Sequence, residues 1–247
     1  GLTDSVVAQQ EVLDLLLAHL PAHFPQHYHW QGDRFYNQLT AESWLPSDFA
    51  AQPIDLAGRL VQDDLCLMMP SPEGYRLAAA SLCFPLHWRL RDKLGLPVAQ
   101  IHEPVPGYTP ALERPVDSFF ERLRPDCPGY RLNWSIVDTP ELFLGDFGHS
   151  QERPAVAESL TPETVGDRLW LRVERQTLRR LPQSNGVLFG IHTYINPLRS
   201  LADYPDIAAG LAEAIAQIPP DMQQYKNLLP VRDPVLQYLN RVLEPRT

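Results

Sequence analysis

Proline is the residue that most restricts how this chain can fold, because 25 prolines are spread along its 247 residues. Each proline fixes its own backbone angle and lacks an N–H donor, so it is poorly tolerated inside helices and central strands. The prolines do not gather in one tract, as they would in a disordered linker. We therefore expect many short helices and strands joined by fixed turns.

Hydrophobic periodicity predicts helices at both ends of the chain and strands in the middle. The first helix has the N-cap candidates Thr3, Asp4 and Ser5, and the last follows the cap-and-proline pair Asp233-Pro234. The predicted helices are Ser5–Leu20, Trp88–Leu94 ending at Gly95, Val116–Leu123, Ile207–Ile218 and Pro234–Leu243. The predicted strands are Leu65–Met69, Tyr75–Phe84, Tyr130–Val137, Leu169–Glu174 and Gly186–Ile195. The segments His27–Ala51 and Asp138–Gly166 have no sustained period and are expected to form loops and short turns.

Strands between terminal helices indicate an α/β fold of the α+β kind, in which helices pack on an antiparallel sheet. The apolar fraction of 44% can bury a sizeable core, and residues 1–247 are expected to form one domain.

The net charge of -9 opposes binding to nucleic acid or to an anionic membrane. Neither a long apolar run nor a secretory signal is visible, so we expect a soluble, cytoplasmic protein.

Cysteine and histidine do not occur in an obvious zinc or disulfide pattern. Cys66, Cys83 and Cys127 are odd in number and widely spaced, which is typical of reduced core thiols. Of the histidines at 19, 23, 27 and 29, only His19 and His23 have i, i+4 spacing, and no nearby cysteine or carboxylate completes a zinc set. The motifs GxSxG, HExxH, P-loop and GxGxxG are absent, which argues weakly against the enzyme classes that use them.

The segment IHEPVPGY, residues 101–108, places one histidine beside a restricted backbone. His102 is followed by Pro104 and Pro106, which limit the conformations of the chain beyond it. A fixed backbone positions an imidazole reproducibly, which suits a ligand that binds a metal or haem iron through one nitrogen while a hydrogen bond holds the other. The alternative is that His102 satisfies buried backbone groups beside a turn.

The segment LRVERQTLRRLP, residues 171–182, concentrates four arginines and one glutamate within nine residues. Strand alternation directs Arg172 and Glu174 to one face, opposite Val173. Buried arginines recognise paired oxygens such as those of haem propionates, and a glutamate can hold a cationic substrate. The alternative is a solvated face with surface ion pairs, which would stabilise the fold little.

Two further polar and aromatic pairs lie in predicted strands. His192 and Tyr194 are two residues apart and should project from one face, where they could line a polar pocket. Asn133 and Trp134 are equally compatible with the wall of a ligand site and with a satisfied core.

Several segments, taken in order, resemble the family of the haem-dependent oxidative N-demethylase alpha subunit. The resemblance spans about Gln62 to Leu198. Its most specific parts are DKLG followed by IHEPVPGY, then NWS, and then ERQTLRRLP before an aromatic strand. Because all three occur in the same order, we favour the functional interpretations of these residues over the structural ones.

The resemblance implies a fold similar to PAS sensor domains, with haem b between an antiparallel sheet and its flanking helices. It also implies a haem-dependent oxidoreductase that uses O2 to demethylate a small secondary methylamine and releases formaldehyde. In the characterised type of this family, electron-transfer partner subunits carry FMN and a 2Fe-2S centre and deliver electrons from NADPH. Only the haem part of such a system is expected in this chain.

The resemblance also assigns roles to the candidate residues. His102 becomes the expected iron ligand and must be neutral to bind the metal. Glu174 and Arg175 are the expected catalytic groups that polarise the oxygen site and hold the amine, with Tyr194 and Asn133 as further members of that pocket. The expected partners of the haem propionates, on charge chemistry alone, are Arg172, Arg179 and Arg180.

Two departures from the family pattern affect these expectations. The chain begins close to the first matching segment, so any longer amino-terminal part of relatives is expected to be shortened here. His192 stands where the family prefers arginine before Thr193-Tyr194, so the substrate is not assumed to be dimethylamine.

The competing functions are a haem-based gas or redox sensor and an interaction module without haem. A carboxylate near haem favours the enzyme over the sensor, because an uncompensated carboxylate would disfavour simple oxygen binding.

Overall fold

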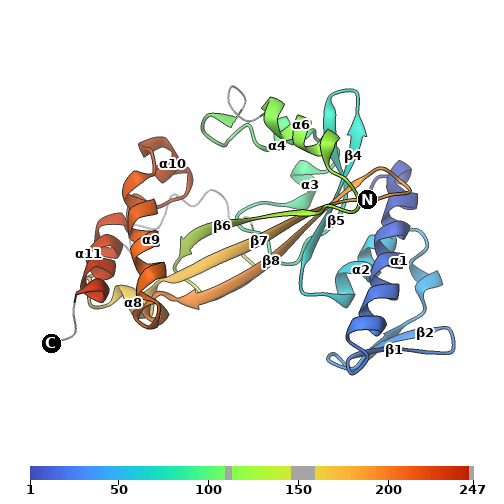
Figure 1. Cartoon of the computed structure of the whole chain (residues 1–247), viewed down its shortest axis with the longest axis horizontal. Helices are drawn as coiled ribbons and strands as arrows, with labels where there is room; N and C mark the ends of the chain where they lie inside the picture. Colours follow the sequence, from blue (N-terminus) through green and yellow to red (C-terminus); the bar gives the residue numbers. More distant parts are fainter. Residues whose placement is uncertain (109–112, 146–158, 245–247) are drawn as a thin grey trace.

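A five-stranded antiparallel sheet runs through the centre of the protein (Figure 1). The computed structural model describes residues 1–108, 113–145 and 159–244. The sheet has the order β5-β4-β8-β7-β6, so its first and last strands along the chain, β4 and β8, pair at the centre. Its strands are β4 (Asp64–Ser71), β5 (Gly74–Ser81), β6 (Gly129–Val137), β7 (Trp170–Arg180) and β8 (Val187–Pro197). The predicted α+β class with an antiparallel sheet is confirmed.

The longest strands, β7 and β8, form a hairpin of eleven residues on each side. In its turn the Leu181 N–H donates to the Gly186 carbonyl at 2.8 Å, and the Asn185 N–H donates to the Leu181 carbonyl at 3.1 Å. Asn185 has a φ of 59°, which asparagine tolerates better than most residues. The predicted strand Leu169–Glu174 therefore ended too early, because the whole run of charged residues continues in strand conformation to Arg180.

A second, three-stranded sheet lies within His27–Ala51, where the loop prediction was wrong. It consists of β1 (Tyr28–Gln31), β2 (Arg34–Asn37) and β3 (Glu42–Trp44), paired antiparallel in that order. Strands this short contain too few residues for an alternating pattern to be recognised. The turn signal was nevertheless present, because Gly32-Asp33 joins β1 to β2 as a two-residue loop in which Gly32 has a φ of 62°.

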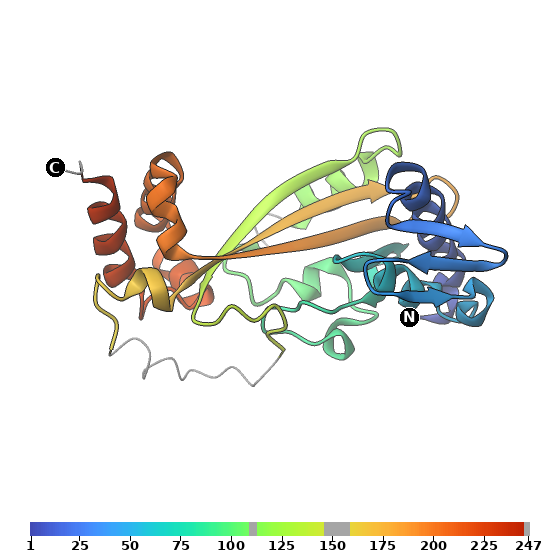
Figure 2. The same cartoon turned by 90° about the horizontal axis from the view of Figure 1, so that it is seen from below.

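Helices pack at both ends of the five-stranded sheet and cover parts of both of its faces (Figures 1 and 2). At one end lie α1 (Val6–His23) and α2 (Pro53–Leu60), and at the other lie α9 (Pro205–Gln217), α10 (Pro220–Tyr225) and α11 (Arg232–Leu243). Between the two ends, α3 (Leu90–Lys93), α4 (Val98–Ile101) and α6 (Glu113–Arg122) cover β4 and β5. The remaining short helices are α8 (Val165–Arg168) and the 3-10 turns Thr3–Ser5, Pro46–Phe49 and Leu198–Asp203.

All five predicted helices are present, but their ends differ from the predictions. The Ser5 hydroxyl donates to the Leu2 carbonyl at 2.6 Å and does not cap α1. Helix α11 begins at Arg232, so Asp233 lies inside its first turn and pairs with the Arg232 side chain at 2.9 Å. Gly95 follows α3 with a φ of 88°, which confirms it as the helix-ending glycine.

The buried apolar side chains form three clusters: beneath α1 and α2, around α8, α9 and α11, and beneath α3, α4 and α6.

All three cysteines are free thiols, as predicted. Only Cys66 lies in the core, and the prediction of a core position was wrong for Cys83 and Cys127, which are exposed. Burial raises the pKa of Cys66 to about 12, so this thiol stays protonated. Across the described ranges, no helix is long and apolar enough to span a bilayer. Of the predicted irregular segment Asp138–Gly166, residues 146–158 lie outside the described residues.

Candidate functional site

His102 lies at the end of α4, and one of its ring nitrogens is held by the backbone. Its Nδ1 lies 2.8 Å from the carbonyl oxygen of Val98, one helical turn earlier. A carbonyl oxygen can only accept a hydrogen bond, so Nδ1 carries the proton and the lone pair of Nε2 is available. The ring also stacks on Tyr108, with centroids 4.8 Å apart. His102 therefore has the tautomer and the fixed orientation that a metal ligand needs.

Burial favours the neutral form of this imidazole. Desolvation lowers the pKa of His102, the hydrogen bond to Val98 opposes that change, and the positive charges of Lys93 and Arg131 add to the lowering. A neutral imidazole is the form that binds a metal, because the proton and the metal compete for the same lone pair.

The residues after His102 form consecutive turns that fix Tyr108 against the imidazole. The Val105 N–H donates to the His102 carbonyl at 2.8 Å, and the Tyr108 N–H donates to the Val105 carbonyl at 3.1 Å. Gly107 adopts a φ of 72°, a left-handed conformation that favours glycine. The sequence IHEPVPGY thus specifies the geometry of the histidine through its turn residues.

A second group of polar side chains surrounds Glu174. Gln176 Nε2 donates to Glu174 Oε2 at 2.9 Å, and Asn133 Nδ2 donates to the same oxygen at 3.4 Å. The Nε of Arg172 lies 3.8 Å from Oε1, and the glutamate side chain is only 13% exposed. We call this group the Glu174 cluster; its members are Arg131, Asn133, Arg172, Glu174, Gln176 and Lys226.

Strand register explains why the Glu174 cluster and His102 lie on the same face of the sheet. Asn133 is the cross-strand partner of Glu174, so both side chains project to one side. Leu178, four residues further along β7, faces the same way and packs in the core cluster that contains Tyr108. We call this side, which α3, α4 and α6 cover, the inner face.

Arg172 is fully buried and connects β7 to two other segments on the inner face. Its Nη1 donates to the Leu142 carbonyl at 2.9 Å, and its Nη2 donates to the Phe84 carbonyl at 2.5 Å. Asp64, which is 1% exposed, accepts the Phe84 N–H at 2.9 Å, and burial raises the pKa of its carboxyl. Of the three guanidinium nitrogens of Arg172, only Nε, the atom that lies 3.8 Å from Glu174 Oε1, has no hydrogen-bond partner among the described residues.

Lys226 reaches the Glu174 cluster from the residues after α10. Its Nζ donates to the Trp134 carbonyl at 2.8 Å and to Asn133 Oδ1 at 3.2 Å. Burial lowers the pKa of Lys226; the charge of Glu174 opposes this and that of Arg131 adds to it. No sequence pattern identifies Lys226, because it lies 93 residues from Asn133 along the chain.

Arg131 and Gln176 are further members of the cluster, and neither was predicted as a site residue from the sequence. The Nε of Arg131 donates to Gln176 Oε1 at 2.7 Å. Here a signal existed, because Arg131 lies two residues before Asn133 and Gln176 lies two residues after Glu174. Strand alternation therefore places both on the same face as predicted site residues.

The structure divides the predicted catalytic group between two faces. Glu174 and Asn133 lie on the inner face, whereas Arg175 and Tyr194 lie on the opposite, outer face. Arg175 is the cross-strand partner of His192, whose ring lies 4.6 Å from that of Tyr194. The predicted pairing of His192 with Tyr194 on one strand face is therefore present, but the two rings lie away from Glu174.

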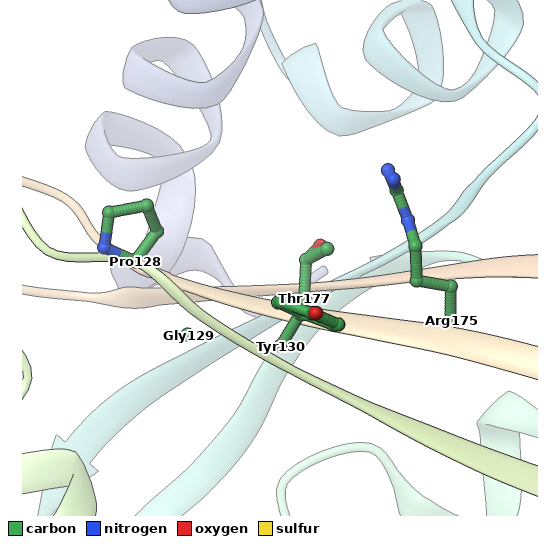
Figure 3. A pocket seen from close by; sticks show the side chains of 5 residues that line it. All are labelled: Pro128, Gly129, Tyr130, Arg175 and Thr177. Atoms are coloured by element: carbon green, nitrogen blue, oxygen red, sulfur yellow. The ribbon is translucent and has the colours of Figure 1, made fainter.

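The outer face carries an open hollow beside Arg175. Its volume is about 360 Å³, and its lining residues are Pro128, Gly129, Tyr130, Arg175 and Thr177 (Figure 3). Arg175 and Thr177 project to the same side of β7. Next to this hollow, His192 Nδ1 lies 2.5 Å from Asp63 Oδ1, which fixes the imidazole to the strand region before β4.

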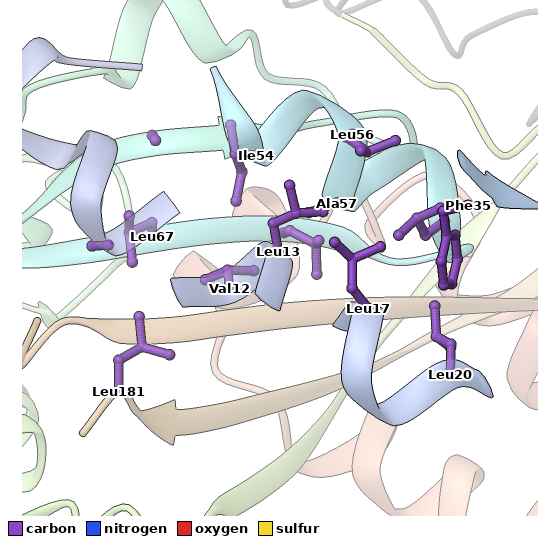
Figure 4. Packing of buried hydrophobic residues seen from close by; sticks show 14 of the residues in the cluster. Val12, Leu13, Leu17, Leu20, Phe35, Ile54, Leu56, Ala57, Leu67 and Leu181 are labelled. Atoms are coloured by element: carbon purple, nitrogen blue, oxygen red, sulfur yellow. The ribbon is translucent and has the colours of Figure 1, made fainter. Parts of the chain in front are cut away.

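Helices α1 and α2 cover the outer face of β4 and reach the β7–β8 turn. Leu13 of α1 and Ile54 of α2 belong to the same buried cluster as Leu67 of β4 and Leu181 after β7 (Figure 4). This packing separates the covered part of the outer face from the open part around Arg175.

The three arginines predicted to bind propionates have different environments. Arg180 is buried, and its donors reach the Leu123, Phe120 and Asn185 carbonyls and the Tyr75 hydroxyl. Arg172 likewise donates hydrogen bonds to the backbone carbonyls of Leu142 and Phe84. Arg179 is exposed and lies on the outer face, where its charge acts on His19. Two of the three arginines therefore link parts of the fold, and the third lies on the other side of the sheet.

Fold and site together define an α+β protein with a neutral, oriented histidine and a half-buried carboxylate on one face of an antiparallel sheet. Residues 2–236 match the family described as haem-dependent oxidative N-demethylase, alpha subunit-like, and the chain belongs to this family. The resemblance seen in the sequence is thus confirmed, and the match extends beyond Gln62–Leu198 in both directions. The family name indicates dependence on haem and likeness to an alpha subunit, a term for one member of a set of subunits.

The residues of the inner face fit a haem by their chemistry. His102 offers an imidazole nitrogen whose lone pair is available, which is the usual protein ligand of haem iron. Tyr108 and the apolar side chains beneath α4 offer a low-dielectric surface for a porphyrin ring. Arg131 and Lys226 offer positively charged donors for carboxylates.

Proposed function

We propose that this chain binds haem b through His102 and catalyses the oxidative N-demethylation of a small secondary methylamine. The observation that carries the proposal is the hydrogen bond from His102 Nδ1 to the Val98 carbonyl, because it leaves Nε2 as a ligand in a chain whose family depends on haem. When bound, haem supplies the redox chemistry that activates O2.

Glu174 is the proposed acceptor for the substrate ammonium group. Its Oε2 already accepts from Gln176 and Asn133, which fixes the plane of the carboxylate. Among the described residues, Oε1 accepts no hydrogen bond and has only the Arg172 Nε at 3.8 Å. A half-buried carboxylate oxygen of this kind binds a charged N–H donor more strongly than a neutral one. The proton that the ammonium group loses before reaction passes to this oxygen.

The proposed reaction is balanced as R–NH–CH3 + O2 + two electrons + two protons giving R–NH2 + HCHO + H2O. The methyl carbon is oxidised when one oxygen atom forms a C–O bond in place of a C–H bond, and the other oxygen atom leaves as water. The carbinolamine then breaks its C–N bond, releasing formaldehyde while nitrogen takes the hydroxyl proton. The electrons come from a reductase partner, in accord with the alpha-subunit character of the family.

The test of this function uses the full chain reconstituted with haem and supplied with electrons by NADPH, ferredoxin reductase and ferredoxin. Formaldehyde is measured with a panel of secondary methylamines and with the corresponding amines that lack a methyl group. We expect formaldehyde only with methylamines, in a ratio of one per two electrons consumed. A haem-loaded chain that shows neither an amine-dependent spectral shift nor formaldehyde would contradict the enzyme function and favour a sensor.

A further inference from the structure

The cations of the Glu174 cluster exceed the carboxylates that can balance them. Arg131, Arg172 and Lys226 carry three positive charges, whereas Glu174 and the adjacent Asp64 carry two negative charges when ionised. Arg172 lies close enough to both carboxylates for each to stabilise its charge. Once Arg172 is balanced, at most one carboxylate charge among the described residues is left for Arg131 and Lys226 together.

The side chains of Arg131 and Lys226 both carry a positive charge, and both belong to the Glu174 cluster. Each is bound to a neutral amide, Arg131 to Gln176 Oε1 at 2.7 Å and Lys226 to Asn133 Oδ1 at 3.2 Å. Arg131 is exposed whereas Lys226 is partly buried, and like charges repel, so the charge of Arg131 lowers the pKa of Lys226. An anion placed between them would remove this repulsion.

Their remaining donors are suited to such an anion. In the part of the chain that the structure describes, Arg131 uses only its Nε in a hydrogen bond, so both terminal nitrogens remain available. Lys226 uses two of its three N–H donors, on Asn133 Oδ1 and the Trp134 carbonyl. The paired terminal nitrogens of an arginine match a carboxylate, and a lysine adds a point charge.

We propose that Arg131 and Lys226 form the carboxylate-binding pair of the inner face, and that the groups they bind are the haem propionates. This inference rests on the proposed haem site. It places the pair on the same face of the sheet as His102. It also replaces the earlier assignment to Arg172, Arg179 and Arg180, because Arg172 and Arg180 donate to backbone carbonyls and Arg179 lies on the outer face. When the propionates balance the charges of Arg131 and Lys226, the carboxylate of Glu174 remains available to bind the ammonium group of the substrate.

The test compares two ligands that differ only in their carboxylates, namely haemin and haemin dimethyl ester. The full apo chain is titrated with each ligand, and the dissociation constant is obtained from the Soret absorbance. The variants are Arg131→Gln, Lys226→Met, the conservative Lys226→Arg and the control Arg124→Gln, whose arginine is 72% exposed and pairs with Asp126. The melting temperature of each variant establishes that it is folded.

We expect Arg131→Gln and Lys226→Met each to weaken haemin binding by about 10-fold to 100-fold, the factor that a lost charge-assisted hydrogen bond gives. Binding of the dimethyl ester should change by less than about threefold, and Lys226→Arg should retain most of the haemin affinity. The proposal is overturned if the variants weaken both ligands equally or neither. A wild-type chain that binds both ligands equally, with a histidine-ligated spectrum, would overturn the carboxylate pair while leaving the haem site intact. A chain that binds neither porphyrin would overturn both.

Discussion

Glu174 and Arg175 are consecutive residues of β7, yet their side chains project from opposite faces of the sheet. Glu174 accepts hydrogen bonds from Gln176 and Asn133 in the half-buried cluster, whereas Arg175 is exposed beside the outer hollow. A strand places every second side chain on the same face, so one residue step exchanges the two environments completely.

Removing the charge of Glu174 should weaken amine binding without removing haem. In Glu174→Gln the side chain keeps its size but loses the anion that binds an ammonium group, so the affinity for a methylamine should fall by about 10-fold to 100-fold. The measurement is the amine-dependent shift of the visible spectrum. Arg175→Gln changes the charge of the outer face and should alter that affinity by less than about threefold. Equal losses in the two variants would refute the assignment of Glu174 to the substrate side.

Replacing Arg172 should destabilise the fold strongly. Arg172→Met leaves the Leu142 and Phe84 carbonyls without their donor and leaves Glu174 without its nearest cation, and we expect a loss of about 3–5 kcal/mol. Urea unfolding of the apo chain measures this change. The control is Arg199→Met, which removes an exposed ion pair with Asp167 and should cost less than about 1 kcal/mol. Similar losses in both variants would show that Arg172 does not hold these segments.

His102 should make the apo chain less stable in acid. Its folded pKa is lowered, so below about 6.5 the unfolded chain binds a proton that the folded chain does not, and stability is lost as the pH falls. The loss continues until the pH reaches the folded pKa, with a slope of at most about 1.4 kcal/mol per pH unit. Urea unfolding between pH 7.5 and pH 5.5 should show a smaller slope for His102→Gln than for the wild type. His19, whose pKa burial also lowers, is present in both chains and cancels in the comparison. Identical slopes would argue against a neutral, buried His102.

Glu11 should contribute to stability by joining α1 to the β7–β8 turn. Its carboxylate accepts the backbone N–H groups of Gln183 at 2.9 Å and Ser184 at 2.8 Å, and also the Ser184 hydroxyl. Glu11→Ala removes these charge-assisted bonds and should cost about 2–4 kcal/mol in urea unfolding. Asp14→Ala changes an exposed residue of the same helix and serves as the control. The link is refuted if both substitutions have equally small effects.

Long periodic elements could be predicted from the sequence, but their ends and the shortest strands could not. Four of the five predicted helices and the strands of the central sheet have enough residues to show their period, whereas the four-residue helix α3 was predicted with the help of the terminating Gly95. The sheet of β1, β2 and β3 was missed, because strands of three or four residues show none. Helix α10 was also missed, since its six residues begin with Pro220 directly after Pro219 and show no apolar face.

The geometry of the site could be predicted where it is set within one short segment of the sequence. It could not be predicted where the contacts join residues that are far apart along the chain. The turns around His102 could be inferred from Pro104, Pro106 and Gly107. Placing Arg175 with Glu174 failed because sequence proximity was given more weight than strand alternation. Lys226 could not be foreseen, because only the tertiary fold brings it to Asn133.

The most direct test of the account is the absorption spectrum of the purified chain with haem, compared between the wild type and His102→Gly. The wild type should show the Soret and visible bands of a histidine-ligated haem in the ferric and dithionite-reduced states. His102→Gly should lose this signature and regain it when imidazole is added, because free imidazole can replace the missing ligand. The control His23→Ala, which changes an exposed histidine at the end of α1, should keep the wild-type spectrum. A wild type without a Soret band, or a His102→Gly variant whose spectrum is unchanged, would contradict the central claim.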